Sequence, residues 1–176
     1  INDVLNFAKL EAGRVTVDMG DVAVDGLLSG AVEMVRPQLA AKKLAYTYHG
    51  GDPLVRARAD AERAMQIILN LLTNAVKFTE GGGSVSLEWE ATDDEVLVRV
   101  RDTGIGIPEE KLGNIFEPFM QVASGNSAVR EGVGLGLAIS RDLARLMGGD
   151  LDVASEAGKG SVFTLRLKRA ESAAAS

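Results

Sequence analysis

The sequence contains no cysteine and only one histidine among its 176 residues. Without cysteine, neither a disulfide framework nor a thiolate metal site can form, and a reducing compartment is permitted. No apolar run approaches the roughly 20 residues that span a bilayer, and no signal peptide opens the chain. We therefore expect a cytoplasmic domain that makes no direct contact with a membrane.

Positive charge is also in short supply. Lys and Arg total 19 against 25 Asp and Glu, which gives a formal net charge of -6 and a pI near 4.9. Nucleic-acid backbones require clustered Lys and Arg, so we expect no nucleic-acid partner. The hydrophobic content of 46% and charged content of 25% are typical of one compact soluble domain. The chain starts at Ile1, without Met and in a helical pattern, so we expect a piece of a longer protein.

Periodicity predicts the secondary structure along most of the chain. Helical spacing or capping residues predict helices over residues 1–13, 25–41, 60–78, from Pro108 onward and 135–147. Apolar–polar alternation predicts strands over residues 15–19, 44–49, 54–58, 84–91, 95–102, 150–155 and 161–167. Pro37 raises doubt about the middle of the second helix.

These elements predict an α+β fold with two layers. We expect a mixed, mostly antiparallel sheet with helices packed on one face. Residues 116–131 lose all periodicity and are rich in Ser, Gly, Asn and Arg, which predicts a long loop or mobile lid. The main domain should cover residues 14–169, after a helix end at 1–13 and before a disordered tail at 170–176.

The predicted helix after Asp60 carries a polar stripe. Asn70, Asn74 and Lys77 are four and three residues apart, so they share one side of the helix. A solvated face is the simplest interpretation, but solvated faces favour Glu and Lys, and Asn is a mediocre helix former. An amide oxygen can join phosphate oxygens around Mg²⁺, and a lysine can meet a phosphate. Both interpretations stay open from the residues alone.

A glycine-rich turn follows a predicted buried strand. The strand EVLVRVRD runs into DTGIGIP, so Asp102 ends the strand while Gly104 and Gly106 let the backbone turn tightly beside it. A carboxylate at this position can accept a hydrogen bond from a ligand. An ordinary turn leading to a helix cap explains the same residues equally well.

A second glycine cluster precedes the last predicted helix. The segment EGVGLGLAIS places Gly132, Gly134 and Gly136 where backbone N–H groups and the helix dipole converge, which suits an anion such as phosphate. A dinucleotide fingerprint has a different spacing and must follow a strand. A plain helix-entry loop remains the alternative.

Two aromatic residues and the single histidine have simpler explanations. Phe116 and Phe119, three residues apart, are more typical of core packing and could anchor the lid. His49 ends a predicted strand before two glycines, where a lone histidine is usually structural or idle.

Four segments together resemble a known family. NLLTNAVKF, DTGIGIP, FEPF and GVGLGLAIS, in this order and at these separations, resemble the N, G1, F and G2 boxes of the sensor histidine kinase catalytic domain, a member of the GHKL superfamily with the Bergerat fold. The resemblance covers about Asp60 to Leu167 and includes a closing strand, GKGSVFTLRL. The opening INDVLNFAKLEAG is similar to the end of the second helix of that family's dimerisation and phosphoacceptor domain.

The resemblance implies that the domain binds ATP with Mg²⁺. It implies that Asp102 binds the adenine amino group, Asn74 coordinates Mg²⁺, Asn70 and Lys77 line the phosphates, and Arg130 neutralises charge on the transferring phosphoryl group. Catalytic roles would thus fall to Asn70, Lys77 and Arg130. The further nucleotide-binding residues would be Phe78, Gly104, Gly106, Ile107, Phe116, Gly132, Gly134, Leu135, Gly136, Leu137 and Ser161.

The same resemblance implies partners in a two-component phosphorelay. The phosphoryl acceptor would be a histidine of a dimerisation and phosphoacceptor domain upstream of Ile1, because His49 does not match its position. A response-regulator receiver domain would act downstream, and the parent protein would be a homodimer.

Two rival functions remain. ATPases of the same superfamily carry a Glu at the position of Asn70 to activate water, and an amide cannot accept that proton usefully at neutral pH. A degenerate module that binds nucleotide or a partner without transfer is the second rival. It is favoured by Val133, where the family often has Thr or Ser, and by Ala128, where it often has Arg.

Overall fold

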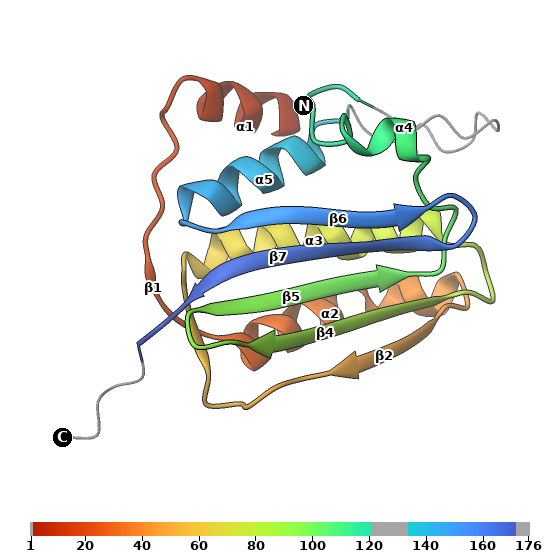
Figure 1. Cartoon of the computed structure of the whole chain (residues 1–176), viewed down its shortest axis with the longest axis horizontal. Helices are drawn as coiled ribbons and strands as arrows, with labels where there is room; N and C mark the ends of the chain where they lie inside the picture. The colour runs from red at the N-terminus through yellow and green to blue at the C-terminus, as the bar shows by residue number, and fades with distance from the viewer. Residues whose placement is uncertain (1, 121–133, 172–176) are drawn as a thin grey trace.

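The computed structural model describes residues 2–120 and 134–171, and this part of the chain forms two layers. One layer is a seven-stranded sheet, and the other consists of helices on one face of it (Figure 1). The predicted two-layer α+β fold is therefore confirmed. Arg130 and Gly132, most of the predicted lid and the end of the tail lie outside the described residues.

The sheet is mixed and mostly antiparallel, as predicted. Its order is β1-β3-β7-β5-β4-β2, with β6 paired to β7 beyond this path. β2 runs parallel to β4, and the other pairings among the described strands are antiparallel. The strands are β1 (Gly20–Ala23), β2 (Ala45–His49), β3 (Arg56–Ala59), β4 (Ser84–Ala91), β5 (Glu95–Asp102), β6 (Asp150–Glu156) and β7 (Gly160–Arg169).

In Figure 1, α2 and α3 lie behind the sheet, while α5 and α1 lie above its β6 edge. α2 and α3 pack against each other beneath the strands, α5 packs on α3, and α1 packs on α5. The helices are α1 (Asn2–Glu11), α2 (Val24–Ala41), α3 (Ala61–Phe78), α4 (Glu109–Leu112) and α5 (Gly136–Leu146). No helix in the described ranges is both long and apolar enough to cross a membrane.

Alternation along the central strands decides which side chains face the helices. The inner face of β4 and β5 is apolar because every second residue is buried, as the predicted hairpin requires. The buried apolar residues of these two strands are Val85, Leu87, Trp89, Val96, Val98 and Val100. The same alternation places Asp102, at the end of β5, on the inner face.

The N-terminus of α3 is fixed by Asp60, as predicted. Its Oδ1 accepts hydrogen bonds from the backbone N–H groups of Glu62, at 3.0 Å, and Arg63, at 3.2 Å. Its Oδ2 accepts a third from the N–H of Asp18, at 2.8 Å. One capping carboxylate thus also ties the segment before β1 to the helix that carries the polar stripe.

Several predicted boundaries were wrong. Residues 15–19 form no strand, because Val15, Val17 and Met19 alternate in packing against the core and pair with no other strand; β1 begins only at Gly20. β3 starts at Arg56 instead of Leu54, whose side chain is 84% exposed.

The structural positions of Pro37 and Pro108 differ from those that the sequence suggested. α2 continues through Pro37 without a break to Ala41, so the doubt about its middle was unfounded. Pro108 is the residue before α4 instead of its first helical residue, and α4 is a single turn.

Candidate functional site

Three polar residues on neighbouring strands form a row at one end of the sheet. Asp102 on β5 pairs with Ser161 on β7, and Ser161 pairs with Ser155 on β6. Directly opposed residues of antiparallel strands share a face, so all three side chains point toward the helical layer. We call these three residues the polar row. It lies where the sheet faces α3, beside the apolar core.

Asp102 is the charged member of the polar row and is only 8% exposed. Its Oδ1 accepts hydrogen bonds from the N–H of Gly104, at 2.9 Å, and the N–H of Ser161, at 3.3 Å. Burial raises the pKa of this carboxyl above its ordinary value of 3.8, and the two N–H donors oppose that rise only in part. Its Oδ2 accepts no hydrogen bond from any described residue, so a ligand amine can donate to it.

The turn after Asp102 is pressed between α3 and the β6–β7 turn, and its glycines are needed there. A Cβ on Gly104 would overlap the carbonyl of Phe78, the last residue of α3. Gly106 has a φ of 69°, and a Cβ there would overlap the carbonyl of Glu156. The N–H of Ile105 donates to the carbonyl of Phe78 over 3.2 Å. The turn is therefore fixed directly against the end of α3.

The polar stripe of α3 is half-buried, not a fully solvated face. Asn70 donates from Nδ2 to the hydroxyl of Ser140 on α5, at 3.1 Å. A Cβ built on Gly136, the first residue of α5, would lie 2.5 Å from Oδ1 of Asn70. The helix entry predicted to bind an anion therefore stands against the amide predicted to line the phosphates. Asn74 and Lys77 continue the stripe toward the turn at Asp102.

A lysine from another helix fixes the end of this stripe. Lys42, which follows α2, donates from Nζ to the carbonyls of Val76, at 2.6 Å, and Lys77, at 3.0 Å. A cation at a helix C-terminus satisfies carbonyls that the helix leaves unpaired and favours its dipole. Nζ of Lys77 itself lies 5.4 Å from the ring centre of Phe78. Lys77 and Phe78, the two predicted site residues at this end of α3, therefore contact each other, and Lys42 fixes the backbone beside them.

The entry to α5 is tight. Gly134 has a φ of 75°, and its carbonyl accepts a hydrogen bond from the N–H of Phe119 over 3.0 Å. Leu135 is buried beneath this turn, while Leu137 is half-buried against the core. Phe119 and Gly134 therefore lie side by side on either flank of residues 121–133.

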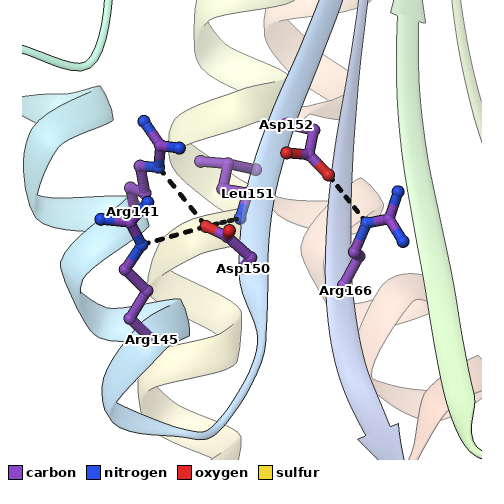
Figure 2. A network of polar contacts seen from close by, with 6 residues as sticks. All are labelled: Arg141, Arg145, Asp150, Leu151, Asp152 and Arg166. Atoms are coloured by element: carbon purple, nitrogen blue, oxygen red, sulfur yellow. Dashed lines mark hydrogen bonds and ion pairs between the residues drawn. The ribbon is translucent and has the colours of Figure 1, made fainter.

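Phe116 is half-buried and packs against the core, as predicted, and it is held by an arginine. Its ring meets Phe163 edge-on at 6.4 Å, and the guanidinium of Arg141 lies 4.5 Å from its centre. Arg141 and Arg145 both donate to Oδ1 of Asp150, at 3.4 and 3.2 Å, so α5 is tied to β6 (Figure 2).

Phe119 is not a core residue, because 60% of its surface is exposed. Its ring lies edge-on to Phe7 of α1, with 5.9 Å between ring centres. The prediction of core packing was therefore wrong for the second phenylalanine of the FEPF segment.

His49 lies apart from the polar row, in agreement with the low priority that the sequence gave it. It is exposed at the end of β2, the edge strand, and pairs with Glu88 of β4. β4 therefore separates it from β5 and from Asp102.

Three residues of the site were not singled out from the sequence: Ser140, Arg141 and Ser155. Ser140 lies one turn after Gly136 on α5, so helical spacing could have pointed to it. Ser155 precedes Ser161 by six residues across the β6–β7 turn, and hairpin pairing could have placed the two together. Nothing local indicates that Arg141 stacks on Phe116.

Comparison with known families identifies one match over most of the chain. The family described as "Histidine kinase-, DNA gyrase B-, and HSP90-like ATPase" matches residues 59–171. This range begins just before the Asp60 cap and contains the polar stripe, both glycine turns and the polar row.

Known proteins similar to this chain are sensor kinases. The sensor histidine kinase RcsC of Escherichia coli (strain K12) is 38% identical over 168 residues, which cover 95% of this chain and 18% of that protein. The autoinducer 2 sensor kinase/phosphatase LuxQ of Vibrio vulnificus is 38% identical over 173 residues, covering 95% of this chain and 20% of that protein. The chain thus spans about a fifth of the length of these relatives.

A solved structure has the same arrangement. The crystal structure of full-length ShkA in complex with AMPPNP superposes with a TM-score of 0.86 at 38% identity. The alignment covers 98% of this chain and 36% of that one.

Proposed function

The chain belongs to the family of histidine kinase-, DNA gyrase B- and HSP90-like ATPases and is the ATP-binding catalytic domain of a sensor histidine kinase; from this we propose that it transfers the γ-phosphoryl group of Mg-ATP to a histidine of a separate phosphoacceptor domain. The chain corresponds to only about a fifth of the length of its relatives, so this proposal concerns the catalytic domain and not the sensory input of the whole protein.

One observation carries the proposal: both glycine segments meet α3, at two places along its length. Gly104 lies against the carbonyl of Phe78, and Gly136 lies against the amide of Asn70. Eight residues of helix separate these contacts, which is about 12 Å at the helical rise. That span suits a nucleotide whose base lies at the Phe78 end, beside Asp102, and whose phosphates lie at the Asn70 end, beside the entry to α5.

The base end supplies hydrogen-bond acceptors. We assign Oδ2 of Asp102 to the exocyclic amine of adenine, because the residue is only 8% exposed and this oxygen has no partner among the described residues. Phe78, Gly104, Gly106, Ile107 and Ser161 would enclose the base. Phe116 would support this end through its contact with Phe163.

The phosphate end supplies amides, a cation and backbone donors. Asn70 and Lys77 would line the phosphates, and the backbone from Gly134 to Leu137 would wrap them, since N–H groups at the start of a helix attract anions. Arg130 and Gly132 are assigned to the same end by resemblance alone, because they lie outside the described residues.

The chain fits a magnesium ion only as part of a nucleotide complex. Within the described ranges, no three of His, Cys, Asp and Glu come together in a cluster that could hold a metal. Mg²⁺ needs few protein ligands when phosphate oxygens complete its shell, and we assign the amide oxygen of Asn74 to it. Bound there, the ion would neutralise phosphate charge, while the chain's own residues orient the nucleotide.

The proposed reaction is an in-line displacement. A ring nitrogen of the acceptor histidine attacks the γ-phosphorus, the bond from that phosphorus to the β–γ bridging oxygen breaks, and ADP leaves with the electron pair. Asn70 stands where a hydrolase of this family needs a carboxylate base, and its Nδ2 is engaged with Ser140, so water is not activated from this position.

We also propose the domain's partners. α1 would be the end of the helix leading from the dimerisation and phosphoacceptor domain, residues 14–169 the catalytic domain and residues 170–176 a tail. The phosphoryl group would pass from that histidine to a response-regulator receiver domain. The domain would be cytoplasmic, and the parent protein would be a homodimer.

The test is phosphoryl transfer in trans. The chain is incubated with γ-labelled ATP, magnesium and a separately produced dimerisation and phosphoacceptor domain from the parent protein. We expect acid-labile label on that domain, as a phosphorus–nitrogen bond requires, and its loss in the Asn74→Ala variant. Steady phosphate release without acceptor would instead identify an ATPase. Nucleotide binding without transfer would identify a degenerate module.

A further inference from the structure

Ser155 is the member of the polar row to which the proposed function gives no role. It is half-buried on β6, and its hydroxyl oxygen takes part in three hydrogen bonds. The partners are the N–H of Ile107 at 2.8 Å, the carbonyl of Gly160 at 2.8 Å and the hydroxyl of Ser161 at 2.7 Å. These partners belong to the turn after Asp102 and to the first two residues of β7.

The direction of each hydrogen bond follows from what a hydroxyl can do. It has one hydrogen and two lone pairs. The carbonyl of Gly160 can only accept, so the single hydrogen of Ser155 goes there. The N–H of Ile107 can only donate, so it takes one lone pair. The remaining lone pair of Ser155 faces Ser161, which must therefore donate its own hydrogen to Ser155.

This arrangement leaves Ser161 with lone pairs only. Its hydrogen is committed to Ser155, and its N–H is committed to Oδ1 of Asp102. Asp102 beside it is a carboxylate, which accepts and does not donate. The inner end of the sheet therefore offers hydrogen-bond acceptors to a ligand, from Ser161 and from Oδ2 of Asp102.

We infer that Ser155 is a positioning residue: by holding the Ser161 hydroxyl as an acceptor, it makes the base subsite select 6-amino over 6-oxo purine nucleotides. The inference rests on the proposed function, because it concerns the base subsite of the same nucleotide site. A 6-amino group donates to these acceptors directly or through a water. A 6-oxo group places its own acceptor against them, which leaves buried polar groups unpaired.

Ser155 also has a structural role that the test must separate from selectivity. Without its hydroxyl, the N–H of Ile107 loses its partner, and the turn after Asp102 loses an anchor. A looser turn would weaken every purine nucleotide alike. Release of the Ser161 hydroxyl hydrogen from Ser155 would instead change the preference between the two bases. The freed hydroxyl can rotate and donate to a 6-oxo group.

The experiment compares ATP with inosine triphosphate by calorimetric titration of the full chain in the presence of magnesium. The variants are Ser155→Ala, Ser155→Cys, Ser155→Thr, Ser161→Ala and the Ser155→Ala/Ser161→Ala double variant. Ser155→Cys keeps the side-chain volume, so it reports on the hydroxyl even if Ser155→Ala does not fold. Ser86→Ala is the matched control, since Ser86 lies on β4 and alternation puts it on the opposite face from the polar row.

We expect Ser155→Ala and Ser155→Cys to lower the ratio of the inosine triphosphate Kd to the ATP Kd by about fivefold, the effect of one hydrogen bond. Ser155→Thr, which keeps the hydroxyl, and Ser86→Ala should retain the ratio. Adding Ser155→Ala to Ser161→Ala should change it no further, because Ser155 acts through Ser161.

Equal weakening of both nucleotides would overturn the inference and leave Ser155 as a turn anchor. The inference would also be overturned if the double variant had a ratio about fivefold lower than that of Ser161→Ala alone, because Ser155 would then act independently of Ser161. A wild-type chain that binds neither nucleotide would reject the proposed function itself, which distinguishes the two failures.

Discussion

Gly136 and Asn70 are in direct apposition: a Cβ built on Gly136 would lie 2.5 Å from the side-chain oxygen of Asn70. Asn70 is held in that place by its hydrogen bond to Ser140, one turn further along α5. α5 therefore begins against the polar stripe of α3, and its first residue has no room for a side chain. This apposition brings the helix entry close to the amide that we assign to the phosphates.

Gly136→Ala should displace the Asn70 amide. The new methyl group must push Oδ1 away or shift the start of α5, so we expect ATP affinity to fall by about tenfold or more, the order of effect of a lost hydrogen bond to a charged group. Gly26→Ala on α2 is the matched control, because a Cβ there has only ordinary contacts. Calorimetric titration with Mg-ATP measures both. Unchanged affinity in Gly136→Ala would mean that Asn70 does not contact the phosphates.

ATP binding should weaken as the pH falls toward the pKa of Asp102. Burial holds that pKa above the ordinary 3.8, and binding of the adenine amine requires the ionised carboxylate. Affinity should therefore begin to fall at a higher pH than an exposed Asp would give. Asp102→Asn should lower the affinity at neutral pH by about tenfold or more and remove this pH dependence. Asp93→Asn, in the exposed β4–β5 turn, serves as the control; an identical pH profile in wild type and Asp102→Asn would refute the assignment.

Asp60→Ala should destabilise the fold through the N-terminus of α3. Loss of the cap should lower the free energy of unfolding by about 1–2 kcal/mol, measured by urea denaturation. Burial alone would raise the pKa of Asp60, but three backbone N–H donors outweigh it and the pKa lies below 3.8. The stabilisation is thus fully present above pH 3.8 and is lost as the pH falls through the folded-state pKa. Asp93→Ala should have little effect, and equal losses in the two variants would contradict the capping role.

Lys42→Met should loosen the end of α3 that carries Lys77. The lysine satisfies the carbonyls of Val76 and Lys77, and we expect a loss of about 0.5–1.5 kcal/mol in unfolding free energy. Lys43 is the matched control, since it is the next residue and is exposed. Lys43→Met should leave unfolding unchanged in the same urea titration. If both substitutions lower the unfolding free energy equally, the two carbonyl contacts of Lys42 make no specific contribution to stability.

Local signals in the sequence determined much of the fold. Asp60 predicted the start of α3 because a side-chain cap acts within three residues. Alternation predicted β4 and β5 to the residue, since an antiparallel hairpin buries every second side chain. The order and spacing of the four sequence boxes predicted the family, which the comparisons confirmed.

Other features could not be predicted from the sequence, and the reasons are physical as well. Alternation at residues 15–19 indicated a strand, but the same period arises when an irregular segment packs every second residue on a core. The site roles of individual residues stay predictions, and those of Arg130 and Gly132 lie outside the described part of the chain.

What the sequence by itself determined are properties set within a few residues: caps, glycine turns, strand alternation and the polar stripe on α3. Only the tertiary structure decided which of these meet. The hydrogen bond between Asn70 and Ser140 joins residues 70 positions apart, and that between Asp102 and Ser161 joins residues 59 positions apart. Such contacts depend on strand order and helix packing, which no local period encodes. The polar row, and with it the role of Ser155, exists because β5, β7 and β6 lie side by side.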